Sequence, residues 1–122
     1  MTDERTIYLF KLQAEICKTL ADPTRLMILH ELKRGEMSVR QLTANLGLPQ
    51  SNVSRHLAVL RERAVVETRR DGTTIYYRLA DPKIAEACNL VREVLEGHLT
   101  RNQKLATSLE SLRNYLRKDQ ST

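Results

Sequence analysis

Residues 38–63, SVRQLTANLGLPQSNVSRHLAVLRER, contain two short helical patterns separated by a tight turn. Ser38 followed three residues later by Gln41 has the spacing of a capping box, and apolar residues continue at helical spacing as far as Gly47. Pro49 suits the first position of a second helix. The apolar positions expected on its buried side are Val53, Leu57 and Leu60. Two short helices joined by a glycine-containing turn predict a helix-turn-helix.

The residues that follow change from a helical period to a period of two. Residues 66–70 and 75–79 alternate in the manner of half-buried strands, and Asp71-Gly72 between them is typical of a hairpin turn. A β-hairpin directly after a helix-turn-helix is a wing. The predicted fold class is therefore mainly α with a β-hairpin wing, a winged helix-turn-helix.

Helical patterns flank this central segment on both sides. One helix is predicted from Thr6 to Ala21, with apolar residues on more than half of its circumference, and a helix of this kind usually packs against two neighbours. Asp22-Pro23, a capping residue followed by proline, begins a second helix that ends at Gly35. Asp81-Pro82 repeats this start signal near the end of the chain.

The C-terminal segment carries an apolar seam that steps by threes and fours, interrupted by His98 and Asn102. Its members are Ile84, Cys88, Val91, Leu95, Leu105, Leu109, Leu112 and Leu116. The sequence leaves open whether Gly97 divides the segment into two helices. Because a small core cannot cover a stripe of this length, the seam suggests a partner chain.

Length and composition exclude several classes of protein. A chain of 122 residues has room for one domain and not for a separate catalytic one. No carboxylate pair, nucleophile beside a base or glycine-rich phosphate loop stands out, so we expect neither enzyme activity nor a cofactor. The sequence contains no apolar run long enough to span a membrane, and the N-terminus does not resemble a secretory signal. We therefore expect a cytoplasmic protein without a membrane partner.

The charge balance favours a nucleic-acid partner. Lys and Arg number 20 against 15 Asp and Glu, a net charge of +5 that attracts polyanions. Aromatic residues are only 4% of the chain, so few rings are available to stack on single-stranded bases. Double-stranded DNA is the expected partner.

Four polar side chains share one arc of the second helix of the helix-turn-helix: Gln50, Ser51, Ser54 and Arg55. Gln can bond adenine through two hydrogen bonds, Arg can bond guanine in the same way, and Ser reaches base edges or phosphates. A merely solvated helix face is the alternative, but the tight turn before it and the basic hairpin after it favour DNA reading. His56 lies nearer the apolar side, where we expect a packed or hydrogen-bonded histidine.

Two arginines stand at the predicted tip of the wing. Arg69 and Arg70 precede the turn, where their guanidinium groups could enter a minor groove or pair with phosphates. An ordinary soluble hairpin end is the alternative interpretation. We predict that both arginines contact DNA.

Three segments together resemble the ArsR/SmtB (arsenic-repressor) family of winged-helix repressors: LADPTR at 20–25, QSNVSRHL at 50–57 and RDGTTIYY at 70–77. The resemblance extends over about residues 20–79. It implies a homodimeric repressor that binds an inverted repeat and releases it when an inducer is sensed. It also implies that the first and last helices form the dimer interface. The chain is then one winged-helix domain, residues 1–122, with a dimerisation helix at 1–21, the winged core at 22–80 and C-terminal dimerisation helices at 81–119.

The two metal sites common in this family do not appear in the sequence. One is a Cys-x-Cys pair at the start of the third helix, where residues 37–40 contain no thiol. The other is an Asp-x-His pair with a later histidine on the C-terminal helix, where residues 81–83 read Asp-Pro-Lys and no imidazole follows near Val94 or Gly97. His98 with Glu93 or Glu96 is a weak surface candidate, and a solitary histidine is more often structural. We assign no metal ligand.

Cys17 and Cys88 are the remaining candidates for sensing, and both fall on apolar stripes. Free cysteines are most often small buried hydrophobes. The alternative is a thiol switch in which an oxidant or reactive sulfur compound links the two sulfurs and repacks the interface, if they lie close enough. Two further hypotheses stay open, a metal- or metalloid-responsive repressor with a non-standard site and a winged-helix interaction module without DNA binding.

Overall fold

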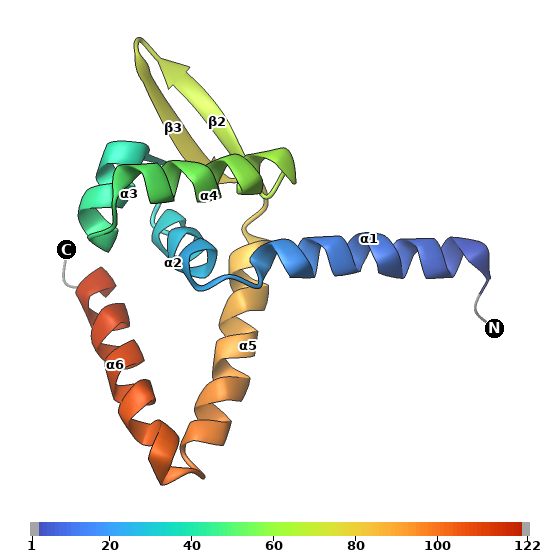
Figure 1. Cartoon of the computed structure of the whole chain (residues 1–122), viewed down its shortest axis with the longest axis vertical. Helices are drawn as coiled ribbons and strands as arrows, with labels where there is room; N and C mark the ends of the chain where they lie inside the picture. The colour runs from blue at the N-terminus through green and yellow to red at the C-terminus, as the bar shows by residue number, and fades with distance from the viewer. Residues whose placement is uncertain (1–2, 121–122) are drawn as a thin grey trace. The chain divides into compact units, whose positions relative to one another are not determined.

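The computed structural model describes residues 3–120, with the side chains of all of these except residues 103–107, 119 and 120. The chain forms two compact units, Met1–Ile84 and Ala85–Thr122. The elements are α1 (Glu4–Leu20), α2 (Pro23–Leu32), β1 (Met37–Ser38), α3 (Val39–Leu46), α4 (Gln50–Glu62), β2 (Val66–Asp71), β3 (Thr74–Leu79), α5 (Lys83–Leu99) and α6 (Gln103–Gln120) (Figure 1). The predicted winged helix-turn-helix is confirmed, with α3 and α4 as the helix pair and β2 and β3 as the wing.

Three predicted capping residues, Asp22, Ser38 and Gly47, lie at helix ends, but α2 ends at Leu32 and not at the predicted Gly35. Gly35 belongs to the turn after the helix, where its N–H donates to the carbonyl of Leu32 at 3.2 Å. Asp22 caps α2 with Pro23 in its first turn, and Ser38 forms a complete capping box with Gln41 at the start of α3. Gly47 ends α3 in the left-handed conformation, with φ of 67°, which glycine adopts at little steric cost. The expectation for Pro49 is wrong by one residue. Its ψ of 141° is extended, so it is the residue before α4, and its carbonyl accepts the first helical hydrogen bonds.

The sheet has one strand more than the hairpin. Its order is β1-β3-β2, all antiparallel, with Met37 of β1 opposite Tyr77 of β3. The hairpin turn is Gly72-Thr73, between the paired residues Asp71 and Thr74, one position later than predicted. Gly72 has φ of 63°, so the residue that needs left-handed backbone opens the turn.

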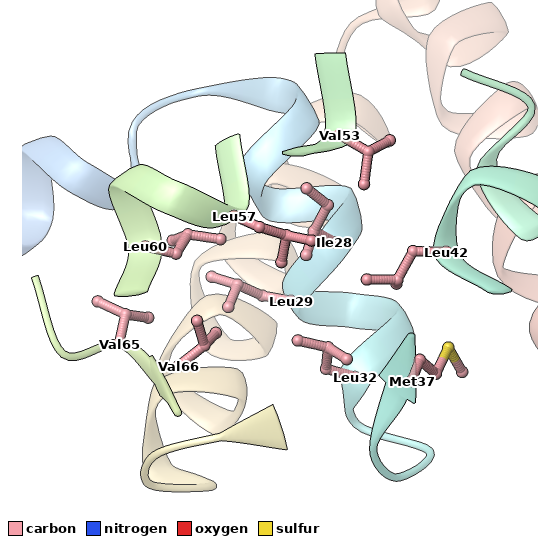
Figure 2. Close-up of a cluster of buried hydrophobic side chains, with 10 residues drawn as sticks. All are labelled: Ile28, Leu29, Leu32, Met37, Leu42, Val53, Leu57, Leu60, Val65 and Val66. Atoms are coloured by element: carbon pink, nitrogen blue, oxygen red, sulfur yellow. The ribbon is translucent and has the colours of Figure 1, made fainter. Parts of the chain in front are cut away.

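One hydrophobic cluster joins α2, β1, α3, α4 and the start of β2 (Figure 2). Its buried members are Ile28, Leu29, Leu32, Met37, Leu42, Val53, Leu57, Leu60, Val65 and Val66. Truncating one such leucine to alanine typically costs about 2 to 5 kcal/mol of folding free energy. Because α4 contributes three of these side chains, the cluster holds its inner side against the core and leaves the opposite side in solvent.

Helix α1 extends away from this cluster, and only its C-terminal end adjoins α2 (Figure 1). Its large apolar side chains are exposed in the single chain, namely Ile7, Tyr8, Leu9, Phe10, Leu12 and Ile16. Thr19 is its one buried residue. The described residues 3–84 of its own unit therefore do not provide the extensive burial predicted for this helix.

Helix α5 continues through Gly97 to Leu99, so a break at Gly97 is not found. The chain leaves the helix at Thr100, whose hydroxyl donates to the carbonyl of Gly97 at 2.8 Å and satisfies an oxygen of the last turn. Two members of the apolar seam on α5, Val91 and Leu95, are exposed, and so are the apolar side chains of Leu90 and Val94 next to them. On α6, Leu109 is buried, while the side chain of Leu105 lies outside the described residues. No helix in the described range 3–120 is long and apolar enough to cross a membrane.

Candidate nucleic-acid interface

The outer side of α4 carries the four residues proposed to read DNA. Gln50, Ser51, Ser54 and Arg55 are all exposed. On the opposite side, Val53, Leu57 and Leu60 have no solvent exposure at all. The helix therefore presents hydroxyl, amide and guanidinium groups from a rigid support, which is the chemistry that major-groove base edges accept. That these four side chains contact bases stays a prediction.

Arg55 has an intrahelical partner that the sequence reasoning did not identify. Its Nη2 donates to Oδ1 of Asn52 at 3.2 Å, one turn earlier. This bond uses one of the five guanidinium N–H groups, so the others remain available. Restricting the rotamers of a long side chain before binding lowers the entropy lost when it contacts a base. Asn52 and Arg55 are three residues apart, and this spacing in the sequence indicates neighbouring side chains on a helix.

The two wing arginines, Arg69 and Arg70, have different surroundings in the structure. Arg69 forms a two-point ion pair with Glu36, because its Nε donates to Oε2 at 3.1 Å and its Nη2 donates to Oε1. Its guanidinium carbon also lies 4.8 Å from the centre of the Tyr76 ring, the geometry of a cation–π contact. The hydrogen bond with Arg69 lowers the pKa of Glu36, and the same bond raises the pKa of Arg69. Arg69 is therefore already paired with a carboxylate in the free protein.

The side chain of Arg70 is on the opposite face of β2 from that of Arg69. Successive strand residues point to opposite faces, so Arg70 shares a face with Val66 and Thr68 and not with Arg69. It is exposed, and its guanidinium has no hydrogen bond or ion pair among the described residues. Of the two predicted contacts, Arg70 is the cation that is free to meet a phosphate. The alternation was present in the sequence, whereas the pairing of Arg69 with Glu36 depends on the unpredicted strand β1.

The sequence of this chain is similar to those of known transcriptional regulators. The profile described as "Bacterial regulatory protein, arsR family" matches residues 22–68. An uncharacterized HTH-type transcriptional regulator of Mycobacterium tuberculosis, Rv0081, is 47% identical over 88 residues, which is 71% of this chain and 77% of that protein. The chain belongs to the ArsR family.

Solved structures agree with this assignment. The crystal structure of Rv0081 has a TM-score of 0.68 at 45% identity and covers 76% of this chain and 94% of its own. Mb0332 of Mycobacterium bovis, a homodimeric winged helix-turn-helix domain described as possibly of the ArsR family, has a TM-score of 0.72 at 34% identity, covering 83% and 94%. The transcriptional repressor BigR of Xylella fastidiosa has a TM-score of 0.66 at 39% identity, covering 77% and 96%. The chain is thus a DNA-binding transcriptional repressor of the ArsR type, with a winged helix-turn-helix fold.

The two cysteines of this ArsR-family chain have different surroundings. Cys17 on α1 is exposed, and Cys88 on α5 is half-buried. Burial raises the pKa of the Cys88 thiol, and the positive charge of Arg92 only partly offsets this effect. Neither cysteine is fully buried in the single chain, so their interpretation as small buried hydrophobes depends on the proposed dimer interface. Their role as sensors stays a prediction.

The described side chains also contain no cluster of three or more His, Cys, Asp or Glu residues placed to hold a metal ion. His56, the histidine expected on the core side of α4, is confirmed there with 8% exposure. Its Nδ1 accepts a hydrogen bond from Nε of Arg25 at 3.3 Å. It is therefore part of the support beneath the recognition surface rather than of the surface itself.

Proposed function

We propose that this chain is a homodimeric repressor that inserts α4 of each subunit into successive major grooves of an inverted-repeat operator, about 34 Å apart. Gln50, Ser51, Ser54 and Arg55 read bases, and Arg70 contacts the backbone or minor groove beside them. Arg69 joins the interface when it exchanges the Glu36 carboxylate for a phosphate. The observation that carries the proposal is the exposed polar side of α4 opposite three completely buried side chains.

A second copy of the chain is the proposed cover for α1. The exposed side chains of this helix include Tyr8 at 63%, Leu9 at 64% and Phe10 at 60% exposure. Exposed apolar surface of this kind marks an interaction site. The homodimeric state of the Mycobacterium bovis neighbour supports a partner identical to the chain itself. Because the proposed target is genomic DNA, we place the protein in the cytoplasm.

The proposed inducer is a thiol-reactive compound. Cys17 lies on the same stripe of α1 as Phe10 and Ala14, so its modification would add bulk or polarity where the second copy packs. Cys88 is the proposed second thiol on α5. A repacked interface would change the distance between the two recognition helices and release the operator. No described group favours the alternative, a metal-responsive repressor with a non-standard site.

Fluorescence anisotropy on duplex DNA from upstream of the protein's own gene tests this function. We expect the reduced protein to bind tightly and a polysulfide to release it, with release lost in Cys88→Ser and in Cys17→Ser. Equal binding before and after treatment would support the proposed DNA binding but would contradict the proposed thiol-reactive inducer. Absence of salt-dependent binding in either state would favour the interaction module over the repressor.

A further inference from the structure

A polar cluster lies beneath α4, and Arg25 of α2 is at its centre. Nη1 of Arg25 donates to the backbone carbonyl of Thr19 at 3.0 Å, and its Nε donates to Nδ1 of His56 at 3.3 Å. Its backbone N–H donates to the capping carboxylate of Asp22 at 3.1 Å. Thr19 is 5% exposed and His56 is 8% exposed, so two of the connected groups are buried.

The chemistry of these bonds requires an arginine. Thr19 is in the last turn of α1, where carbonyl groups have no partner within the helix. Nδ1 of His56 accepts the hydrogen bond from Arg25 and also lies 3.8 Å from Oδ1 of Asp22, so both residues at the start of α2 face the same ring nitrogen. The planar guanidinium fork holds both acceptors in a fixed relative position, which the single ammonium group of lysine does not reproduce.

Another contact also joins α1 to α4. Nη2 of Arg63, the residue that ends α4, lies 3.7 Å from Oε2 of Glu15 on α1. Both side chains are about half exposed, so this pair alone contributes little. Together with the Arg25 bonds it means that the otherwise exposed helix α1 is attached to the recognition helix at two points, near the middle of α4 and at its end.

We infer that Arg25 is a positioning residue for DNA reading, because it fixes α4 against the end of α1 through His56. This inference rests on the proposed function, in which the outer side of α4 reads the operator. The Arg25 guanidinium is directed at protein groups, so it acts on base discrimination through the placement of α4. Since α1 is the proposed dimerisation helix, the same bonds connect the subunit interface with the recognition surface.

The test compares binding to an operator duplex with binding to an unrelated duplex over a series of salt concentrations. Arg25→Lys keeps the charge and removes the fork, and we expect the ratio of the two affinities to fall about tenfold (1.4 kcal/mol) without a change in salt slope. His56→Leu removes the acceptor and should produce a similar loss. His56→Asn places an amide oxygen near the position of Nδ1 and should keep most of the ratio. Arg40→Lys, an exposed change on α3, is the matched control and should leave the ratio unchanged.

The double variant Arg25→Lys with His56→Leu shows whether Arg25 acts through His56. We expect it to lose no more discrimination than His56→Leu alone, whereas additive losses would overturn the inference. An unchanged ratio in Arg25→Lys would also overturn it. The ¹⁵N resonance of Nδ1 of His56 gives a second measurement in folded protein, since it should move toward that of a free ring nitrogen in Arg25→Lys. If the wild-type protein itself shows no preference for any operator, the proposed function fails, and this inference fails with it.

Discussion

Arg69 on β2 and Glu36, which immediately precedes β1, form a two-point ion pair across the face of the three-stranded sheet. The guanidinium group reaches the carboxylate by passing over the Tyr76 ring of β3, the strand between them. A carboxylate and a phosphate bind the same fork of N–H groups. Under the proposed function, Glu36 therefore competes with DNA phosphates for the Arg69 guanidinium.

Glu36→Gln should strengthen DNA binding. The change releases the Arg69 guanidinium for a phosphate, so we expect higher affinity on all duplexes and a salt slope that is steeper by about one unit. Anisotropy titrations between low and moderate salt measure both quantities. Glu4→Gln removes one negative charge from the first turn of α1 and is the control, for which the slope should not change. Weaker binding in Glu36→Gln would show that the ion pair holds the wing in its binding position instead.

Arg70→Ala should weaken binding to operator and unrelated DNA alike. Its exposed guanidinium has no partner in the part of the chain that the structure describes, so its loss should reduce the salt slope by about one unit. Arg69→Ala should have a smaller effect, because Arg69 must first leave Glu36. The same titrations compare the two variants. A larger loss of DNA affinity in Arg69→Ala than in Arg70→Ala would contradict the assignment of Arg70 as the main wing contact.

Cys88 should react slowly with alkylating reagents near neutral pH. Burial raises its pKa above the ordinary thiol value of 9.0, so at any lower pH it holds less of the reactive thiolate than a free cysteine does. In Cys17→Ser protein, we expect the alkylation rate at Cys88 to keep rising as the pH passes 9.0. Mass spectrometry of timed samples gives this rate. A Cys88 more reactive than free cysteine at pH 8 would contradict the burial argument.

Leu9→Asp should separate the proposed dimer without unfolding the subunit. Leu9 is 64% exposed in the chain, so the substitution removes little intrachain packing. We expect sedimentation to show a dimer for the wild type and a monomer for the variant, with circular dichroism unchanged. Lys11→Asp, at an exposed polar position of the same helix, is the control that should stay dimeric. If the wild-type protein is itself a monomer, the proposed homodimer is contradicted.

The parts of the fold that could be predicted are those whose signals are local. Asp22 and Ser38 mark helix starts because their side chains bond nearby backbone N–H groups, and Gly47 marks an end because it adopts left-handed backbone. Strand β1 could not be predicted, since two residues carry no period and its pairing depends on β3. The pairing of Glu36 with Arg69 was hidden for the same reason.

The polar side of α4 was predictable from helical spacing, but its support was not. The bonds from Arg25 to Thr19 and His56 join residues up to 31 positions apart, and no local pattern indicates such a distance. The apolarity of α1 was likewise visible in the sequence, whereas the described residues 3–84 of its own unit leave its large apolar side chains exposed. These long-range relationships depend on the tertiary structure.

Arg55→Ala tests most directly whether the outer side of α4 reads operator bases. We predict a loss of about 1 to 3 kcal/mol on the operator, a much smaller loss on an unrelated duplex, and a similar pattern for the charge-conserving Arg55→Lys. An equal loss on both duplexes, recovered in Arg55→Lys, would make Arg55 a phosphate contact and contradict the claim that it reads sequence.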